Sequence, residues 1–314
     1  MRDIEVFCGS AHPQLAADIC RHLGVPLHPA RVKRFANDCI EVQLPANCRE
    51  RDVFLIQPLI KPVQENLVEL LLMVDAARGA SAGRTTAVLP HFAYARSDKK
   101  DAPRVSIGAR LVADLLVTAG ASRVLTMTLH SPQVHGFFSI PVDHLNALRE
   151  LATHFTGYDL SNSVVLSPDL GNAKPAAAFA RTLGLPVAAG AKVRLSDDEV
   201  VIAEVIGEVA GRDVIVLDDE IAGGTTIFEL LGRLRERGAG AIRVVCTHGL
   251  FADDSLAKLA DQPDVLEIVC TDTVPIPAEK RVPKLRVLSI APALAEAMRR
   301  IHNGESVSAL FGTT

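Results

Sequence analysis

The segment from Asp213 to Thr226 reads DVIVLDDEIAGGTT, and this stretch decides the fold of the chain. Its first part, 214–217, is an unbroken apolar run with the β-branched character of a strand buried on both faces of a parallel sheet. Asp218 and Asp219 follow directly, and a helical pattern opens after the Gly-Gly-Thr-Thr loop. A strand, a glycine-rich loop and a helix in this order indicate an open α/β sheet, which binds ligands at the carboxyl ends of its strands.

The residue types in this loop suit a sugar phosphate. The two adjacent carboxylates can accept hydrogen bonds from the vicinal hydroxyls of a ribose. Gly223 and Gly224 let the backbone approach a ligand closely. Thr225 and Thr226 lie where a helix N-terminus offers amides to a phosphate. The loop has no lysine and lacks the GxxxxGK[ST] spacing, which excludes that class of triphosphate loop. The alternative interpretation is a tight strand-to-helix turn with solvated acids.

Length and composition leave room for two domains and narrow the class of protein. The chain has 314 residues, of which 48% are hydrophobic and 22% are charged. Its 33 basic and 37 acidic residues give a net charge of −4, so we expect no nucleic-acid partner. The longest apolar stretch, 67–74, is too short to span a bilayer, and no leader-like segment precedes IEVFCGS, so we expect a cytoplasmic protein that binds no membrane. Six cysteines without a CxxC pair favour reduced thiols over disulfides or structural zinc.

Strand-like runs alternate with helical patterns along the chain. The strand-like runs are 4–7, 53–56, 86–89, 124–129, 164–166, 214–217, 242–247, 265–269 and 285–288. Helical patterns cover 64–77, 106–118 and 226–237, and glycines beyond them are suitable helix stops. A strand-loop-helix unit recurs on each side of 141–149. The sequence therefore predicts an α/β protein with two doubly wound parallel-sheet domains, 1–146 and 147–314.

Motifs along nearly the whole chain resemble those of the ribose-phosphate pyrophosphokinases. They are RFANDCIEV from position 34, SAGR at 81–84, YARSD at 94–98, LH at 129–130, GFF at 136–138, SPD at 167–169, VAGRD at 209–213 and ESVSALF at 305–311. The stretch 213–226 also resembles the phosphoribosyl-pyrophosphate motif shared with type I phosphoribosyltransferases.

The resemblance implies two domains of phosphoribosyltransferase type in a homo-oligomer, usually a hexamer. Domain 1–146 would bind ATP and domain 147–314 would bind ribose 5-phosphate, with about ten C-terminal residues packing back on the first domain. The implied enzyme is a ribose-phosphate diphosphokinase, which uses Mg²⁺ and ATP to diphosphorylate the 1-hydroxyl of ribose 5-phosphate.

The resemblance assigns catalysis to two cations, Lys192 and Arg194, in the stretch GAKVRLSDDE. An ammonium and a planar guanidinium can hold a triphosphate and stabilise charge on the transferring phosphoryl group. Taken alone, Lys-Val-Arg is more typical of a solvated strand face. The implied ribose 5-phosphate residues are Asp218, Asp219, Ala222, Gly223, Gly224, Thr225 and Thr226.

For the nucleotide, the resemblance implies that Phe35 stacks on adenine and that Arg96 meets the phosphates. The implied ATP-binding residues are Phe35, Asn37, Cys39, Arg96, Ser97, Asp98, Lys99 and His130. His130 and Asp169 are the implied metal ligands. Mg²⁺ prefers oxygen ligands, so Asp169 suits it better, and His130 is as well suited to touch phosphate.

Six positions depart from the family pattern and leave alternatives open. In the sugar loop, Ala222 stands where the family usually has an acid, Gly223 where it has threonine and Thr225 where it has glycine. Thr128 also replaces an acid, and Asn37 and Cys39 replace commonly acidic residues of the family's adenine-binding hairpin, which RFANDCIEV resembles. Glu220 lies close enough in sequence to compensate at the sugar loop. The alternatives are a non-catalytic regulatory paralogue, a phosphoribosyltransferase, or a diphosphokinase for another sugar phosphate. A first domain of the ATP-binding type disfavours the phosphoribosyltransferase.

The resemblance also implies a regulatory site. In family members controlled by phosphate and ADP, an inter-subunit anion and nucleotide site forms at positions matched here by Arg49, Ser81, Ser306, Ser308 and Phe311. Hydroxyls and an arginine are suitable phosphate ligands. The alternative is a C-terminal tail that only packs the oligomer.

Overall fold

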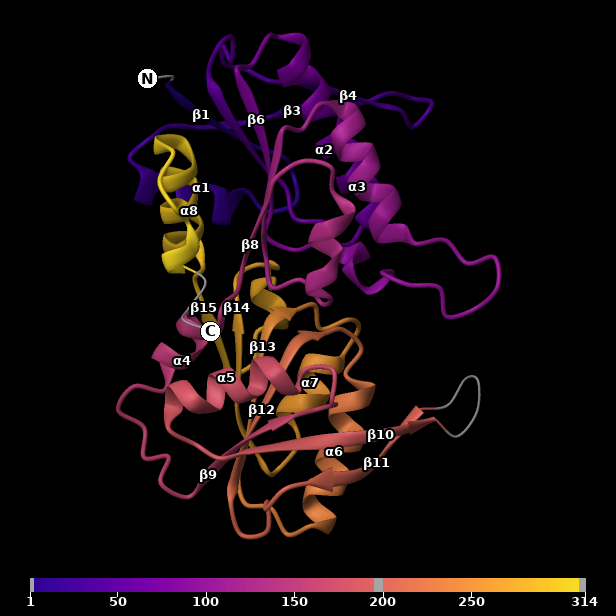
Figure 1. Cartoon of the computed structure of the whole chain (residues 1–314), viewed down its shortest axis with the longest axis vertical. Coiled ribbons are helices and arrows are strands. Elements are labelled where there is room, and N and C mark those ends of the chain that lie inside the picture. Colours follow the sequence, from indigo (N-terminus) through magenta and orange to yellow (C-terminus); the bar gives the residue numbers. More distant parts are fainter. Residues whose placement is uncertain (1–2, 195–199, 311–314) are drawn as a thin grey trace. The chain divides into compact units, whose positions relative to one another are not determined.

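The computed structural model of the chain describes residues 3–194 and 200–310, with side chains except at 192–203 and 309. The chain divides into two compact units, one made of Met1–Asn146 and Ser289–Thr313 and the other mainly of Ala147–Leu288 (Figure 1). Both units are α/β, and each has a mostly parallel sheet with helical connections. The predicted fold class is therefore confirmed. No helix in the described ranges is long and apolar enough to cross a membrane.

The first unit contains a six-stranded parallel sheet in the order β2-β1-β5-β6-β7-β8. Its strands are β1 (Ile4–Cys8), β2 (Leu27–Pro29), β5 (Asp52–Ile56), β6 (Arg84–Leu89), β7 (Arg123–Met127) and β8 (Val142–Leu145). Every residue of β5 is buried, as expected for a central strand covered on both faces. The chain turns from β1 to β2 on one side and continues from β5 on the other, so the sheet has a topological switch point between β1 and β5.

Helices cover both faces of this sheet. They are α1 (Pro13–Leu23), α2 (Val63–Gly79), α3 (Gly108–Ala119) and α8 (Ala291–Asn303), with short 3₁₀ turns η1 (Ala93–Arg96), η2 (Pro132–Phe137) and η4 (Ser308–Leu310). α1 packs against α8, and α2 packs against α3 (Figure 1). A separate antiparallel hairpin, β3 (Arg31–Arg34) and β4 (Ile40–Gln43), packs against α2.

The C-terminal helix α8 belongs to the first unit, whereas the sequence prediction placed 289–303 in the second domain. Two polar contacts explain this correction. The Arg84 guanidinium donates to the Ile301 carbonyl at 2.9 Å, and His302 Nδ1 shares a 2.8 Å hydrogen bond with Asp52 Oδ2. Because Asp52 and Arg84 begin β5 and β6, the end of α8 is fixed at the amino-terminal edge of the first sheet.

The second unit contains a seven-stranded sheet in the order β11-β10-β9-β12-β13-β14-β15. Its strands are β9 (Ser163–Ser167), β10 (Val187–Arg194), β11 (Val200–Ile206), β12 (Asp213–Ile221), β13 (Ile242–Gly249), β14 (Val265–Thr271) and β15 (Leu285–Leu288). Only β11, at the edge, runs antiparallel to its neighbour within the described ranges. The helical elements are α4 (Leu148–His154), α5 (Ala173–Leu183), α6 (Thr225–Glu236), α7 (Ser255–Ala260) and the 3₁₀ turn η3 (Ala278–Lys280).

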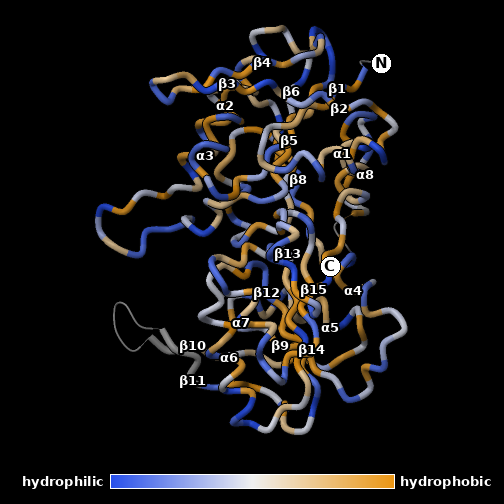
Figure 2. The backbone as a smooth tube through the Cα atoms, turned by 180° about the vertical axis from the view of Figure 1, so that it is seen from behind, coloured by the Kyte–Doolittle hydropathy of each residue, from blue (hydrophilic) through white to orange (hydrophobic). Residues whose placement is uncertain are grey.

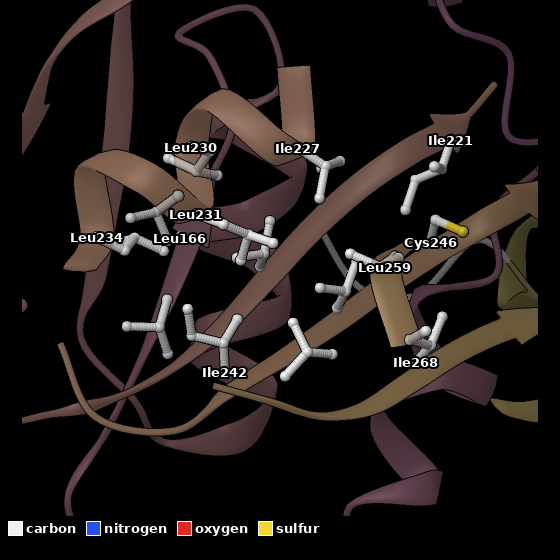
Figure 3. Close-up of a cluster of buried hydrophobic side chains, with 14 of the residues drawn as sticks. Leu166, Ile221, Ile227, Leu230, Leu231, Leu234, Ile242, Cys246, Leu259 and Ile268 are labelled. Carbon is white, nitrogen blue, oxygen red and sulfur yellow. The ribbon is translucent and has the colours of Figure 1, made fainter. Parts of the chain in front are cut away.

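The core of the second unit holds its helices on the sheet. Leu230, Leu231 and Leu234 point from α6 toward strand residues such as Leu166 and Ile242 (Figure 3). These side chains are almost completely buried. Figure 2 shows the same pattern along the backbone, with hydrophobic residues concentrated on the central strands. Burial of apolar area stabilises the fold by about 25 cal/mol per Å². This packing therefore holds the strands, and the loops that follow them, in place.

Candidate functional site

The adjacent acids of the second unit lie within β12 rather than beyond it. The strand continues to Ile221, and Asp218 pairs in register with Cys246 of β13. The expectation that the strand ends at Leu217 was therefore wrong, because the parallel ladder continues past the apolar run. The Asp219 amide donates to Asp218 Oδ1 at 2.9 Å. The carboxyl groups still stand in the carboxyl-terminal part of the strand, where an open sheet binds its ligands.

Three carboxylates approach one another at this edge of the sheet. Burial raises the pKa of Asp218 well above its usual value, and the nearby charges of Asp219 and Asp169 raise it further. Asp169 belongs to the loop after β9, and β9 pairs directly with β12. The structure thus brings the predicted metal ligand Asp169 next to the predicted sugar-binding acids.

Asn172 links these two strand ends and was missed from the sequence. Its backbone amide donates to Asp169 Oδ1 at 3.0 Å, and its Nδ2 donates to the Leu217 carbonyl at 2.9 Å. Ser167 Oγ, at the end of β9, donates to the Asp169 carbonyl at 2.6 Å. The SPDLGN stretch carried no sign of this bridge, because it depends on a strand that is 45 residues away.

The glycine loop after β12 is open toward the start of α6. Gly224 is the N-cap of this helix, with φ +81°, and the helix begins at Thr225. Because the N-cap residue Gly224 has no side chain to cap the helix, the first amides of α6 are candidates to face a ligand. A Cβ atom at Gly224 would lie 2.9 Å from the Phe228 ring, whereas one at Gly223 would meet nothing within 4 Å. Ala222 fixes the loop through its carbonyl, which accepts from the Ala252 amide at 3.0 Å.

The predicted catalytic cations lie on the strand beside β9. The backbone of Lys192 and Arg194 belongs to β10, where Lys192 is in register with Ile202 of β11. Their side chains lie outside the described residues. Because β10 pairs with β9, the backbone of both cations is in the same unit and sheet as the Asp169 loop. Their catalytic role stays a prediction.

In the first unit, two predicted nucleotide-binding segments leave neighbouring strands. Arg96 ends the turn η1 after β6, and His130 follows β7, so both lie at the carboxyl edge of the parallel sheet. Arg96, Lys99 and His130 are exposed, and Asp98 is half-buried. Ser97 Oγ accepts from the Gly108 amide at 2.9 Å, so it closes the loop in front of α3.

The hairpin residues predicted for adenine lie at the turn between β3 and β4. Phe35 is 41% exposed, and the Lys33 ammonium lies 5.0 Å from the centre of its ring. The Phe35 amide donates to the Cys39 carbonyl at 2.8 Å, and the Cys39 amide donates to Asn37 Oδ1 at 3.3 Å. The carbonyl end of Asn37 is therefore used in the turn, and its amide nitrogen is the end that can reach a base.

The loop that carries His130 rests on a second histidine, which sequence reasoning missed. His144 Nε2 on β8 accepts from the Leu129 amide at 2.8 Å. Burial lowers the pKa of His144 to about 4, and the charge of His135 contributes. The ring is therefore neutral near pH 7, as an acceptor must be. Nothing in the sequence marked this residue, because the contact joins the end of β7 to β8 across the sheet.

This buried histidine predicts a loss of stability in acid. In the unfolded chain, His144 has a pKa of about 6.5 and gains a proton below that pH. In the folded protein the ring stays neutral until about pH 4, so acid favours the unfolded state. Folding stability should therefore fall by about 2 kcal/mol more between pH 6.5 and pH 5 than it does in His144→Gln, which does not titrate. Thermal unfolding of both proteins at the two pH values checks this, and parallel acid losses would contradict it.

Two of the predicted regulatory residues, Arg49 and Ser81, lie close together at the opposite, amino-terminal edge of the first sheet. Arg49 forms a bridge with Ala82, and the Glu50 amide donates to the Ser81 carbonyl at 2.8 Å. Arg49 and Ser81 are exposed there. After α8, the Ser308 amide donates to Ser306 Oγ at 3.2 Å. Phe311 lies outside the described residues.

Among residues 3–194 and 200–310, no group of three or more His, Cys, Asp or Glu side chains is arranged to hold an ion. Mg²⁺ is usually bound by one or two carboxylates together with waters and substrate phosphates. The assignment of His130 and Asp169 as metal ligands stays a prediction. The six cysteines are free thiols, and all except Cys39 are buried.

Comparisons with known proteins agree over nearly the whole chain. Residues 4–120 match the N-terminal domain of ribose phosphate pyrophosphokinase, and residues 194–312 match the phosphoribosyl synthetase-associated domain. A Streptomyces coelicolor protein is 75% identical over 99% of this chain and 98% of its own length. The ribose-phosphate pyrophosphokinase of Deinococcus radiodurans is 48% identical over 98% of this chain and 97% of its own length.

A solved structure extends the agreement to three dimensions. The crystal structure of phosphoribosylpyrophosphate synthetase from Mycobacterium smegmatis matches with a TM-score of 0.90 and 39% identity. The match covers 96% of this chain and 100% of the Mycobacterium smegmatis chain. The chain therefore belongs to the ribose-phosphate pyrophosphokinase family of enzymes.

Proposed function

We propose that this enzyme transfers the β,γ-diphosphoryl group of ATP to the 1-hydroxyl of ribose 5-phosphate, giving phosphoribosyl pyrophosphate and AMP. The observation that carries the proposal is the arrangement in the second unit. There the acids of β12 are followed by a glycine loop whose last residue, Gly224, is the N-cap of α6. Family membership over the full chain supports the same reaction.

The sugar is proposed to bind along β12 and its loop. Asp218 and Asp219 accept hydrogen bonds from the ribose hydroxyls, and the amides of Thr225 and Thr226 receive the 5-phosphate. Glycine is required at position 224, because its φ is +81° and a Cβ there would lie 2.9 Å from the Phe228 ring. This assigns the vicinal hydroxyls and the phosphate of the substrate to separate parts of one peptide.

The chemistry is a displacement at phosphorus. The 1-hydroxyl oxygen forms a bond to the β-phosphorus while the bond from that phosphorus to the α,β-bridging oxygen breaks, and AMP leaves with that oxygen. Lys192 and Arg194 are proposed to neutralise charge on the transferring group, which leaves catalysis to positioning and electrostatics.

Mg²⁺ is the proposed cofactor, and it supplies charge neutralisation on the phosphoryl oxygens. Asp169 would hold it in the second unit, where burial, and then the charges of Asp219 and Asp169, raise the pKa of Asp218. His130 would meet the Mg²⁺-nucleotide in the first unit. The aspartate is the better ligand by chemistry, because magnesium favours oxygen.

ATP is proposed to bind to the first unit. Phe35 offers an exposed ring to adenine, Asn37 offers its amide nitrogen, and Arg96 offers a guanidinium to the phosphates. Cys39, Ser97, Asp98 and Lys99 complete the proposed contacts. We further propose that the protein is a homo-oligomer in the cytoplasm. The six free thiols are consistent with a reducing compartment.

The regulatory site yields a separate prediction. Arg49→Ala should blunt inhibition by ADP, because the exposed guanidinium beside Ser81 would serve the phosphates of the ligand. The mass of the assembly should stay the same. ADP inhibition curves at saturating ATP, read together with light scattering, check this. An unchanged curve would remove Arg49 from the site, and a changed mass would favour a packing role.

The proposed reaction is tested by its products. Incubation with Mg²⁺-ATP and ribose 5-phosphate should yield AMP and phosphoribosyl pyrophosphate in equal amounts by mass spectrometry. Formation of neither product would favour the non-catalytic paralogue, and turnover of a different sugar phosphate alone would reassign the substrate.

A further inference from the structure

The β3–β4 hairpin is attached to the first unit unevenly. It forms a two-stranded sheet of its own, and near its base Val42 and Leu44 pack against the hydrophobic core. Toward its turn, a cavity of about 400 Å³ lies between the hairpin and α2. Val32, Arg34 and Ile40 line the hairpin side of this cavity. Apolar packing therefore fixes the base of the hairpin, whereas the strand residues that flank the turn with Phe35 line the cavity.

One polar connection crosses the rim of this cavity. Arg34 ends β3, one residue before Phe35, and its guanidinium donates through two different nitrogens. One bond goes to Asp38 in the turn of the same hairpin, and the other goes to Glu65 in the first turn of α2. A planar guanidinium suits this bridging role, because its donors have fixed directions that a lysine ammonium lacks.

The α2 side of the cavity is fixed more firmly than the hairpin side. The buried carboxylate of Glu69 accepts from the Ser10 amide and from Ser10 Oγ, both at 2.6 Å. Asn66, also buried, donates to the Ile60 carbonyl at 2.8 Å. Glu65 is thus presented by a helix that is anchored to two strand-end loops. The contact between Arg34 and Glu65 therefore orients the hairpin relative to a fixed helix.

We propose that Arg34 and Glu65 are positioning residues that hold the hairpin turn in the orientation in which Phe35 meets the nucleotide base. This inference rests on the proposed adenine role of Phe35. An exposed ion pair contributes little to global stability. Its effect appears in binding instead, because a turn that is already ordered loses less conformational entropy when the nucleotide binds.

The kinetic test uses Glu65→Gln, Arg34→Gln and the double variant. Each single change should raise KM for ATP about threefold to fivefold, the range that one exposed charged contact supports. Turnover and KM for ribose 5-phosphate should stay within about twofold, because this contact is not made to the reacting groups. The double variant should match the worse single variant, since both changes remove the same contact. Unchanged KM for ATP, or a double variant whose effects add, would overturn the proposal.

A matched control lies on the same helix. Asp75 is an exposed carboxylate of α2 that pairs locally with Arg78. Asp75→Asn removes the same charge as Glu65→Gln without touching the hairpin, so it should leave KM for ATP unchanged. An equal rise in both variants would show an effect of net charge and overturn the positioning role.

A second measurement reads the hairpin directly. Cys39 is the exposed thiol at the turn, and the other five cysteines are buried. A nitroxide label on Cys39 should give a broader spectrum in the parent protein than in Glu65→Gln, whose hairpin turn should move more. Identical spectra would overturn the proposal. If Phe35→Ala leaves KM for ATP unchanged, the adenine assignment fails, while the label still reports whether the contact orders the turn.

Discussion

Gly224→Asp is expected to abolish binding of ribose 5-phosphate. Gly224 has φ +81°, which strains any side chain, and a new Cβ would lie 2.9 Å from the Phe228 ring. The carboxylate would also place a negative charge at the start of α6, where the substrate phosphate needs positive potential. Steric and electrostatic effects therefore act in the same direction. Calorimetric titration with ribose 5-phosphate should detect no binding by this variant.

Two comparisons keep this result specific. ATP binding should persist in Gly224→Asp, because the proposed nucleotide residues belong to the first unit. Gly232→Asp adds the same charge farther along α6, where a new Cβ meets nothing within 4 Å, and it should still bind the sugar. Equal affinity of Gly224→Asp and the parent protein for ribose 5-phosphate would rule out this loop as the phosphate site.

Lys192→Ala and Arg194→Ala are each expected to lower turnover by about a hundredfold or more. The loss would arise because charge on the transferring phosphoryl group would no longer be neutralised in the transition state. Steady-state kcat measures the effect, and thermal unfolding should change little. Arg181→Ala, which removes an exposed cation from α5 of the same unit, is the matched control and should keep full turnover. Normal kcat in both test variants would reject the catalytic assignment.

The sequence predicted the central strands well, because they are continuous apolar runs between loop residues. β5 and β12 are clear cases, since both are buried in the middle of parallel sheets. The hairpin of β3 and β4 was expected only from the resemblance of RFANDCIEV, because its residues are mostly exposed and give no apolar run. The true end of β12 was also missed, because its final residues are polar and the ladder to β13 extends them.

The candidate site was predictable only where one peptide carries it. The acids of β12, the glycines and the start of α6 follow one another in sequence, so residue types alone indicated a sugar-phosphate loop. The contacts of Asp169, Asn172 and His144 depend on neighbouring strands that are distant along the chain. No local pattern encodes such contacts. The position of α8 likewise follows from its contacts with Asp52 and Arg84 rather than from its own sequence.

In the proposed reaction, a diphosphoryl group moves in one piece to the sugar. The most direct test follows ATP labelled with ³²P at either the α or the γ position, supplied with Mg²⁺ and ribose 5-phosphate. We expect γ label in phosphoribosyl pyrophosphate and α label in AMP. If γ label entered a sugar bisphosphate while α label appeared in ADP, the enzyme would transfer a single phosphoryl group, and the proposed reaction would be wrong.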